Sequence, residues 1–257
     1  MKVARLLSIS IALLALPAAA NGAGLAPNSI ENVLAVSWEP SFCITADGSG
    51  RPECRTLTAD RFDATHFTLH GLWPDDLDDT DIFPCYCDRG APRSCRGSLR
   101  REARIEISQG VLDDLSVVMP GVMSGLHLHE WTKHGSCYED DKSGADAGAD
   151  PDEYFADSIA LMAQLNDSPV RTLFAENLGE TLTRGEIEAA FDEAFGAGAG
   201  ERVLIRCNSG NISALWINLE GDITPESDLA GLILAAPPAS ASTGTRGCGG
   251  GRVVEVG

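Results

Sequence analysis

Positive charge is the scarcest feature of this 257-residue chain. It has 19 lysine and arginine residues against 38 aspartate and glutamate residues, and its formal net charge is −19 at pH 7. A protein that holds nucleic acid on a broad basic face has the opposite balance, because neutralisation of phosphates by Lys and Arg dominates that kind of affinity. The composition therefore argues against a tight nucleic-acid binder. It still allows an enzyme that turns over its substrate in a small cleft.

The chain also lacks a hydrophobic run long enough to span a membrane. Its longest apolar stretch lies in MKVARLLSISIALLALPAAA at the N-terminus, and about a dozen residues are too few for a bilayer core of roughly 30 Å. Lys2 and Arg5 before this stretch, and the alanines after it, are typical of a secretory signal peptide. We predict a signal peptide at residues 1–23, cleaved near 20–23, and one exported domain at 24–257 without a membrane segment.

Zinc-type cysteine spacing is absent as well. Cys85 and Cys87 are separated by a single residue, whereas zinc sites use spacers of two or more. All eight cysteines follow the predicted signal peptide, and an even number in an exported chain favours disulfides. Close spacing suggests a Cys43–Cys54 bridge. We expect four bridges among Cys43, Cys54, Cys85, Cys87, Cys95, Cys137, Cys207 and Cys248.

No internal repeat and no glycine-rich phosphate loop are present, and strands and helices do not alternate regularly. Helices are predicted where capping residues precede apolar stripes, at Ser108, at Asp150, and at Thr183 with Glu186. Strands are predicted at 33–38, 66–70, 202–207 and 214–220, with the last two forming a hairpin. The expected fold is a single α+β domain with a central antiparallel sheet, flanking helices and stabilising disulfides.

Histidine is rare too, and its distribution is uneven. All five histidines lie in two segments, HFTLHGLWPD at 66–75 and LHLHEWTKHGSC at 126–137. Histidine is the side chain whose unperturbed pKa lies near neutrality, so this crowding indicates proton transfer or metal binding.

The second histidine segment combines bases, a carboxylate and a cation. If 128–135 is helical, His129, Glu130, Lys133 and His134 share one face, which suits stabilisation of a charged phosphorus or acyl centre. A solvated charged face is the structural alternative. A zinc hydrolase is another, but H-E-x-x-H sites place the histidines four residues apart, whereas His129 and His134 are five apart with a lysine between them.

The two segments resemble the active-site motifs of the ribonuclease T2 family, the secreted base-nonspecific ribonucleases. FTLHGLWPD and HEWTKHGSC match in order and separation, and VLAVSW, VMPG and DPDEYF extend the resemblance to bacterial, periplasmic members over most of the mature chain. The resemblance implies that His70 and His134 are the catalytic acid and base. It also implies that Glu130 and Lys133 stabilise the pentacovalent phosphate and that His129 binds phosphate.

The resemblance further implies base contacts, with Trp73 stacking on a base and Asp75 hydrogen-bonding to it. Family members usually carry aromatic residues just before the second motif, where this chain has Leu126 and His127. We expect His66 to be structural and His127 to lie at the rim.

The resemblance also bears on the disulfides. It suggests a Cys207–Cys248 bridge and a bridge from Cys137 to Cys85 or Cys87, with Cys95 taking the other cysteine.

The predicted function is an exported, monomeric endoribonuclease that cleaves single-stranded RNA with little base specificity. One histidine takes the 2′-hydroxyl proton and the other protonates the leaving 5′-oxygen, so a 2′,3′-cyclic phosphate forms first. The reaction needs no metal or other cofactor, and DNA is no substrate because it lacks the 2′-hydroxyl. The alternative from another class is an exported binding protein that keeps this fold without catalysis. The intact histidines and the Glu130/Lys133 pair disfavour it.

Overall fold

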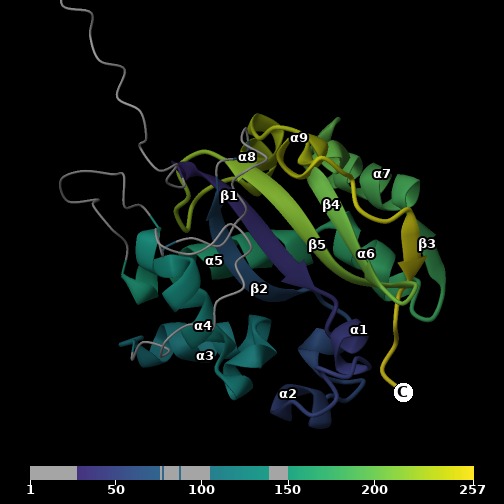
Figure 1. The fold of residues 1–257 in the computed structure, drawn as a ribbon, viewed down its shortest axis with the longest axis horizontal. Coiled ribbons are helices and arrows are strands. Elements are labelled where there is room, and N and C mark those ends of the chain that lie inside the picture. The colour runs from purple at the N-terminus through teal and green to yellow at the C-terminus, as the bar shows by residue number, and fades with distance from the viewer. Residues whose placement is uncertain (1–27, 76, 78–86, 88–104, 139–149) are drawn as a thin grey trace, which may run out of the picture.

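The computed structural model describes residues 28–75, 77, 87, 105–138 and 150–257 (Figure 1). The predicted signal peptide, most of the segment after the first histidine motif, and Cys85 and Cys95 lie outside the described residues. Among the described residues, no helix is long and apolar enough to cross a bilayer.

A six-stranded sheet organises the domain. Strand β1 (Asn28–Ser37) lies between β2 (Thr68–Asp75) and β5 (Asn211–Glu220) and is antiparallel to both. Strand β4 (Val203–Asn208) forms the predicted hairpin with β5. The hairpin turns at Ser209 and Gly210, which both have positive φ, as a two-residue turn of this hand requires. A short strand β6 (Gly250–Arg252) pairs with β5 in parallel and with β3 (Thr181–Thr183) in antiparallel fashion.

The residues of β1 are buried alternately on the two faces of the sheet, as the two-residue period of a strand dictates. Leu34 and Val36 join the main core, to which the flanking helices also contribute. Val33 and Ala35 join a smaller core that contains Trp73 and packs against Trp216. The strand is therefore covered on both sides, which explains its continuous apolar sequence.

The predicted helix starts are confirmed. Ser108 caps α3 (Gln109–Val118) and Asp150 caps α5 (Pro151–Asn166), each accepting a hydrogen bond from a backbone N–H in the first turn. Thr183 and Glu186 form a capping box at α7 (Arg184–Phe195). The other helices are α1 (Glu39–Cys43), α2 (Pro52–Arg55), α4 (Leu126–Lys133), α6 (Pro169–Glu176), α8 (Leu229–Ala235) and α9 (Ala239–Thr243), with 3₁₀ turns η1 (Phe62–Ala64), η2 (Pro120–Ser124), η3 (Gly135–Cys137) and η5 (Ala199–Arg202).

Some predicted boundaries were wrong. Helix α4 ends at Lys133, and His134 is its C-cap with φ −129°, so His134 is not part of the helix. Strand β2 begins at Thr68, and the ring of His66 instead stacks on Phe62 with centroids 4.1 Å apart. Trp38, expected in a strand, precedes α1 and is fully buried.

The disulfides tie distant segments together. The predicted Cys43–Cys54 and Cys207–Cys248 bridges are confirmed. Of the two candidates for Cys137, Cys87 forms the bridge, which leaves Cys85 and Cys95, outside the described residues, as the predicted fourth pair. The fold is the expected disulfide-stabilised α+β domain.

Candidate active site

The two histidine segments meet where α4 packs against β2. Glu130 of α4 lies between a histidine from each segment. Its Oε1 is 3.5 Å from Nε2 of His70, and its Oε2 is 3.8 Å from Nε2 of His134. The carboxyl group is 1% exposed, so all three groups interact with little screening by water.

Glycine at position 71 makes this approach possible. A Cβ on Gly71 would lie 2.1 Å from Oε2 of Glu130 and 2.6 Å from Nε1 of Trp73. Any other residue would displace the carboxylate, because no real Cβ comes this close to another atom. The sequence showed Gly71 directly after His70, but the need for it became visible only once α4 was placed.

Trp73 is a buried neighbour of the three groups. Its indole Nε1 donates a 2.8 Å hydrogen bond to Oε2 of Glu130. Its ring stacks on His134 at a centroid distance of 5.2 Å and meets His70 edge-on at 5.5 Å. With 7% of Trp73 exposed, the ring has little free surface on which to stack a base.

The other predicted base contact, Asp75, lies further along the chain from these groups. It pairs with Asn28 at the far end of β2 and is 3% exposed. The base contacts of Trp73 and Asp75 stay predictions, and the contact that the structure shows for Trp73 is its hydrogen bond to Glu130.

Burial shifts the pKa values within the cluster. It raises the pKa of Glu130 to about 8, against the lowering effects of the Trp73 hydrogen bond and of Lys133. Burial lowers the pKa of His134 well below its ordinary value, as do the nearby charges of Lys133, His70 and His129.

The pKa of His70 is lowered to about 4, first by desolvation and then by His129 and Lys133. Water reaches 44% of this side chain, so its desolvation is partial. Near neutral pH these shifts favour neutral histidine rings and a protonated Glu130. Because the three groups lie in contact, they titrate as one coupled unit. Such a unit can accept a proton at one ring and release one at the other.

A tyrosine of α5 supports the strand that carries His70. The hydroxyl of Tyr154 donates to the carbonyl oxygen of Leu72 at 2.8 Å and accepts from the Leu72 N–H at 3.3 Å. Its ring packs edge-on against Trp131 of α4, which lies against the main core. Sequence reasoning missed Tyr154, whose only signal was a polar aromatic residue in the first turn of an otherwise apolar helix stripe.

A cavity of about 330 Å³ opens beside His70 and His129. Two buried carboxyl groups, those of Glu39 and Glu53, line it together with the exposed Arg51. No sequence motif predicted this cavity, because its walls come from four separate segments.

One group among the described residues has the spacing of metal ligands, namely Glu39 with Cys43 and Cys54. Both cysteines belong to a disulfide, and a disulfide sulfur does not offer the thiolate that metals bind. This group is therefore unsuited to a metal.

Comparison with known proteins decides the family. The model of the Ribonuclease T2 family matches residues 32–226. The chain belongs to the ribonuclease T2 family. It is 28% identical to ribonuclease I of Escherichia coli K12 over 214 residues, which cover 74% of this chain and 75% of that protein.

A second ribonuclease and a solved structure are also similar to this chain. Ribonuclease Rh of Rhizopus niveus is 30% identical over 167 residues, covering 60% of this chain and 66% of that protein. The crystal structure of a self-incompatibility associated RNase, SF11-RNase of Nicotiana alata, has a TM-score of 0.45 at 18% identity, with 77% of this chain and 88% of that chain covered. The family match confirms the prediction of a T2-family endoribonuclease, and the sheet with its flanking helices confirms the predicted α+β fold.

In this T2-family chain, the structure brings together most of the predicted site residues. His70, His134, Glu130 and Trp73 are in direct contact, and the charges of Lys133 and His129 act on both histidines. The individual roles of these residues stay predictions.

Proposed function

We propose that the protein is an exported endoribonuclease that cleaves single-stranded RNA by transphosphorylation, with His70 and His134 as the proton-transfer pair. The observation that carries this proposal is that both histidines lie within 4 Å of the same buried carboxyl group. Two rings linked through one carboxyl can be held in different protonation states, which acid–base catalysis requires.

The first step forms a cyclic phosphate. One histidine removes the proton from the 2′-hydroxyl, the 2′-oxygen bonds to phosphorus, and the bond from phosphorus to the 5′-oxygen breaks as the other histidine protonates that oxygen. In the second step, water attacks the 2′,3′-cyclic phosphate with the proton transfers reversed, and a 3′-phosphate results. Lys133 and His129 supply positive charge to the phosphoryl oxygens, while Glu130 keeps the two histidines in place.

The cavity beside His70 has a place in this reaction. Since it adjoins a proton-transfer residue and is walled partly by apolar side chains such as Phe42 and Leu126, we assign it to the base of one nucleoside flanking the cleaved phosphate. Its volume lies within the usual range for small-molecule sites, roughly 300–1,000 Å³.

The test is cleavage of single-stranded RNA, with a DNA of the same sequence as comparison, in excess chelator. We expect RNA to be cleaved with a 2′,3′-cyclic phosphate as the first product, and DNA to remain intact. His70→Ala and His134→Ala should each lower the rate by roughly 10²–10⁴, the usual contribution of a general acid or base.

His66→Gln is the matched control, because His66 stacks on Phe62 outside the site. It should keep nearly the full rate. A His70 or His134 variant with wild-type turnover would overturn the assignment. A wild-type protein that binds RNA without cleaving it would favour the non-catalytic alternative.

A further inference from the structure

The cavity beside His70 contains a buried hydrogen-bond acceptor without a partner. Glu53 is 2% exposed, and its Oε1 accepts a 2.8 Å hydrogen bond from the Ser124 hydroxyl. Its Oε2 is buried and has no hydrogen-bond partner. Native structures rarely leave such an atom unsatisfied, so Oε2 marks a place where a donor on a ligand is expected.

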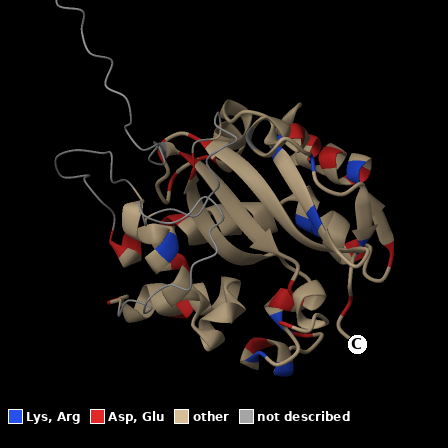
Figure 2. Ribbon diagram, viewed as in Figure 1, with Lys and Arg blue, Asp and Glu red and all other residues tan. Residues whose placement is uncertain are grey.

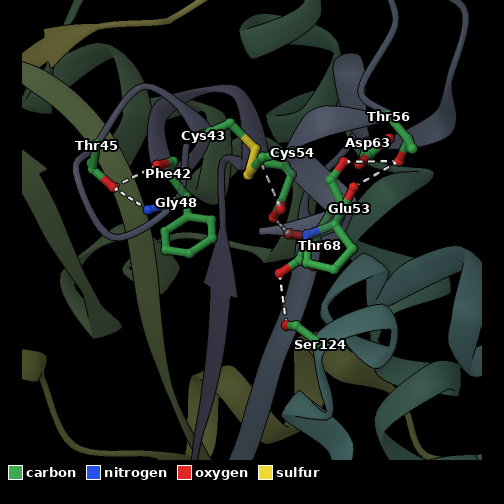
Figure 3. The surroundings of a disulfide bond; sticks show 12 residues. Phe42, Cys43, Thr45, Gly48, Glu53, Cys54, Thr56, Asp63, Thr68 and Ser124 are labelled. Carbon is green, nitrogen blue, oxygen red and sulfur yellow. Dashed lines mark hydrogen bonds between the residues drawn. A yellow bond between two sulfur atoms is a disulfide. The ribbon is translucent and has the colours of Figure 1, made fainter. Parts of the chain in front are cut away.

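The chain holds Glu53 rigidly. It lies in α2, which the Cys43–Cys54 disulfide ties to α1, and its carbonyl oxygen accepts a 2.9 Å hydrogen bond from the Arg61 guanidinium. Ser124 reaches it from η2 on a different segment (Figure 3). A carboxylate fixed from several directions can discriminate between ligands by geometry.

Arg51 adds donors to the same cavity. It is the N-cap residue of α2, it is exposed, and it lines the cavity with Glu53. The cavity therefore presents a carboxylate acceptor in its wall and a guanidinium donor at its rim, two residues apart in the chain.

Guanine carries the complementary set of groups. Its N1–H and exocyclic amino group are adjacent donors that fit one carboxylate, and its O6 and N7 are adjacent acceptors that arginine binds in a bidentate manner. Adenine and cytosine each offer an amino donor beside a ring acceptor, and uracil offers one ring N–H between two carbonyl groups. Neither pattern provides the two adjacent donors that would pair with both oxygens of one carboxylate.

Resting on the proposed function, we propose that Glu53 and Arg51 make this cavity selective for guanine in one of the two nucleosides that flank the cleaved phosphate. Glu53 pairs with the N1–H and the amino group, and Arg51 with O6 and N7. The enzyme is then tolerant of the base on one side of the phosphate and selective on the other, rather than nonspecific on both as the family resemblance implies.

The experiment measures kcat/KM for four dinucleoside monophosphates, UpG, UpA, GpU and ApU. The ratio of UpG to UpA reports on the nucleoside 3′ of the phosphate, and the ratio of GpU to ApU on the nucleoside 5′ of it. We expect one of these ratios to be roughly tenfold or more, the discrimination typical of a good bidentate contact with a base. Glu53→Gln should bring that ratio close to one, because the amide replaces one acceptor by a donor.

Two matched controls separate recognition from folding. Asp157→Asn removes another buried carboxylate, in α5 outside the cavity, and should leave both ratios unchanged. Arg51→Gln should lower the guanine ratio several-fold, whereas Arg55→Gln, on the same helix but outside the cavity lining, should not. If Glu53→Gln fails to fold, the Arg51 and Arg55 pair decides the matter, because both side chains are exposed.

The outcomes are distinct. Wild-type ratios near one, or a guanine preference that survives in Arg51→Gln and in a folded Glu53→Gln variant, would overturn the proposal while leaving the ribonuclease assignment intact. A wild-type protein that cleaves none of the four dinucleotides and no longer RNA would instead refute the proposed function.

Discussion

At the scale of single residues, the absence of a side chain at Gly71 determines where the carboxyl group of Glu130 lies. Gly71→Ala places a Cβ 2.1 Å from Oε2 of Glu130, so Glu130 must move away from one or both histidines. We expect the RNA cleavage rate to fall by roughly 10²-fold or more, comparable to the loss of a positioned acid–base group.

Gly110→Ala is the control for this substitution. A Cβ on Gly110, in α3, meets nothing within 4 Å, and alanine is favoured over glycine within a helix by about 1 kcal/mol. This variant should keep full activity and be slightly more stable. Full activity in Gly71→Ala would show that Glu130 can be displaced without consequence.

Glu39 makes a residue-scale prediction about stability. Burial, then the nearby Asp63, raises its pKa from 4.5 to about 7. Between these values the unfolded chain loses a proton that the folded protein keeps, so this group's contribution to stability falls as pH rises through that window.

Glu39→Gln should therefore gain stability relative to wild type between pH 4.5 and 7, on the order of 3 kcal/mol at most. The Thr68 hydrogen bond to the Glu39 carboxyl is one that glutamine can also accept. Urea unfolding at several pH values measures the difference. Glu186→Gln is the opposite case. Hydrogen bonds from Thr183 lower the Glu186 pKa, so the wild type should gain stability relative to this variant as pH rises. Parallel stability curves for wild type and Glu39→Gln would contradict the prediction.

At the scale of secondary structure, one tyrosine joins α5 to β2. Tyr154→Phe removes the hydroxyl that binds both the carbonyl oxygen and the N–H of Leu72. Leaving buried backbone groups unpaired should cost about 1–3 kcal/mol. We expect the rate on RNA to fall as well, because β2 also carries His70.

Tyr138→Phe provides the comparison, since that buried hydroxyl donates a 3.0 Å hydrogen bond to the carboxyl group of Asp157 in α5. It should lower the free energy of unfolding without changing the rate. Equal rates in the two variants, measured with the proteins fully folded, would show that the Tyr154 contact matters only for stability.

Sequence patterns predicted the starts of helices better than their ends. The caps of α3, α5 and α7 depend on neighbouring residues, which a sequence displays directly. The end of α4 depends on a distant one, because the N–H of Cys87 donates to the carbonyl oxygen of Lys133 and Cys87 is bonded to Cys137. No local pattern contains that information.

The candidate site also has parts that local sequence motifs predicted and parts that depend on contacts between distant segments. The histidines and Glu130 were visible because they occur in two short motifs. The cavity was not, because Glu39, Glu53 and Ser124 come from three segments that only the folded chain brings together. The need for glycine at position 71 was hidden for the same reason.

At the scale of the whole molecule, the charge predicts how activity responds to pH and salt. The net charge is −19, and acidic residues are spread over many elements of the described fold (Figure 2). This field repels RNA at neutral pH, and protonation of carboxylates on acidification reduces the repulsion. We expect a bell-shaped rate profile with its optimum below neutrality, and a rate increase with moderate salt at neutral pH.

Initial rates on a short single-stranded RNA across pH and salt provide the measurement. The alternative is a local basic cleft made by Lys133 with Arg93, Arg96, Arg100, Arg101 and Arg104, and these arginines lie outside the described residues. An optimum above neutrality with a steep loss of rate in salt would show that such a cleft governs encounter with RNA.

The Cys87–Cys137 bridge has a consequence for the timing of activity during biosynthesis. It holds Cys87 against the end of α4, where the Cys87 N–H donates to the carbonyl oxygen of Lys133. Thiols stay reduced in the cytosol and form disulfides in oxidising compartments. A newly made chain therefore lacks the Cys87–Cys137 disulfide while it is still near the ribosomes. Under the proposed function, the nuclease completes its active site only after leaving the compartment that holds the cell's own messenger RNA.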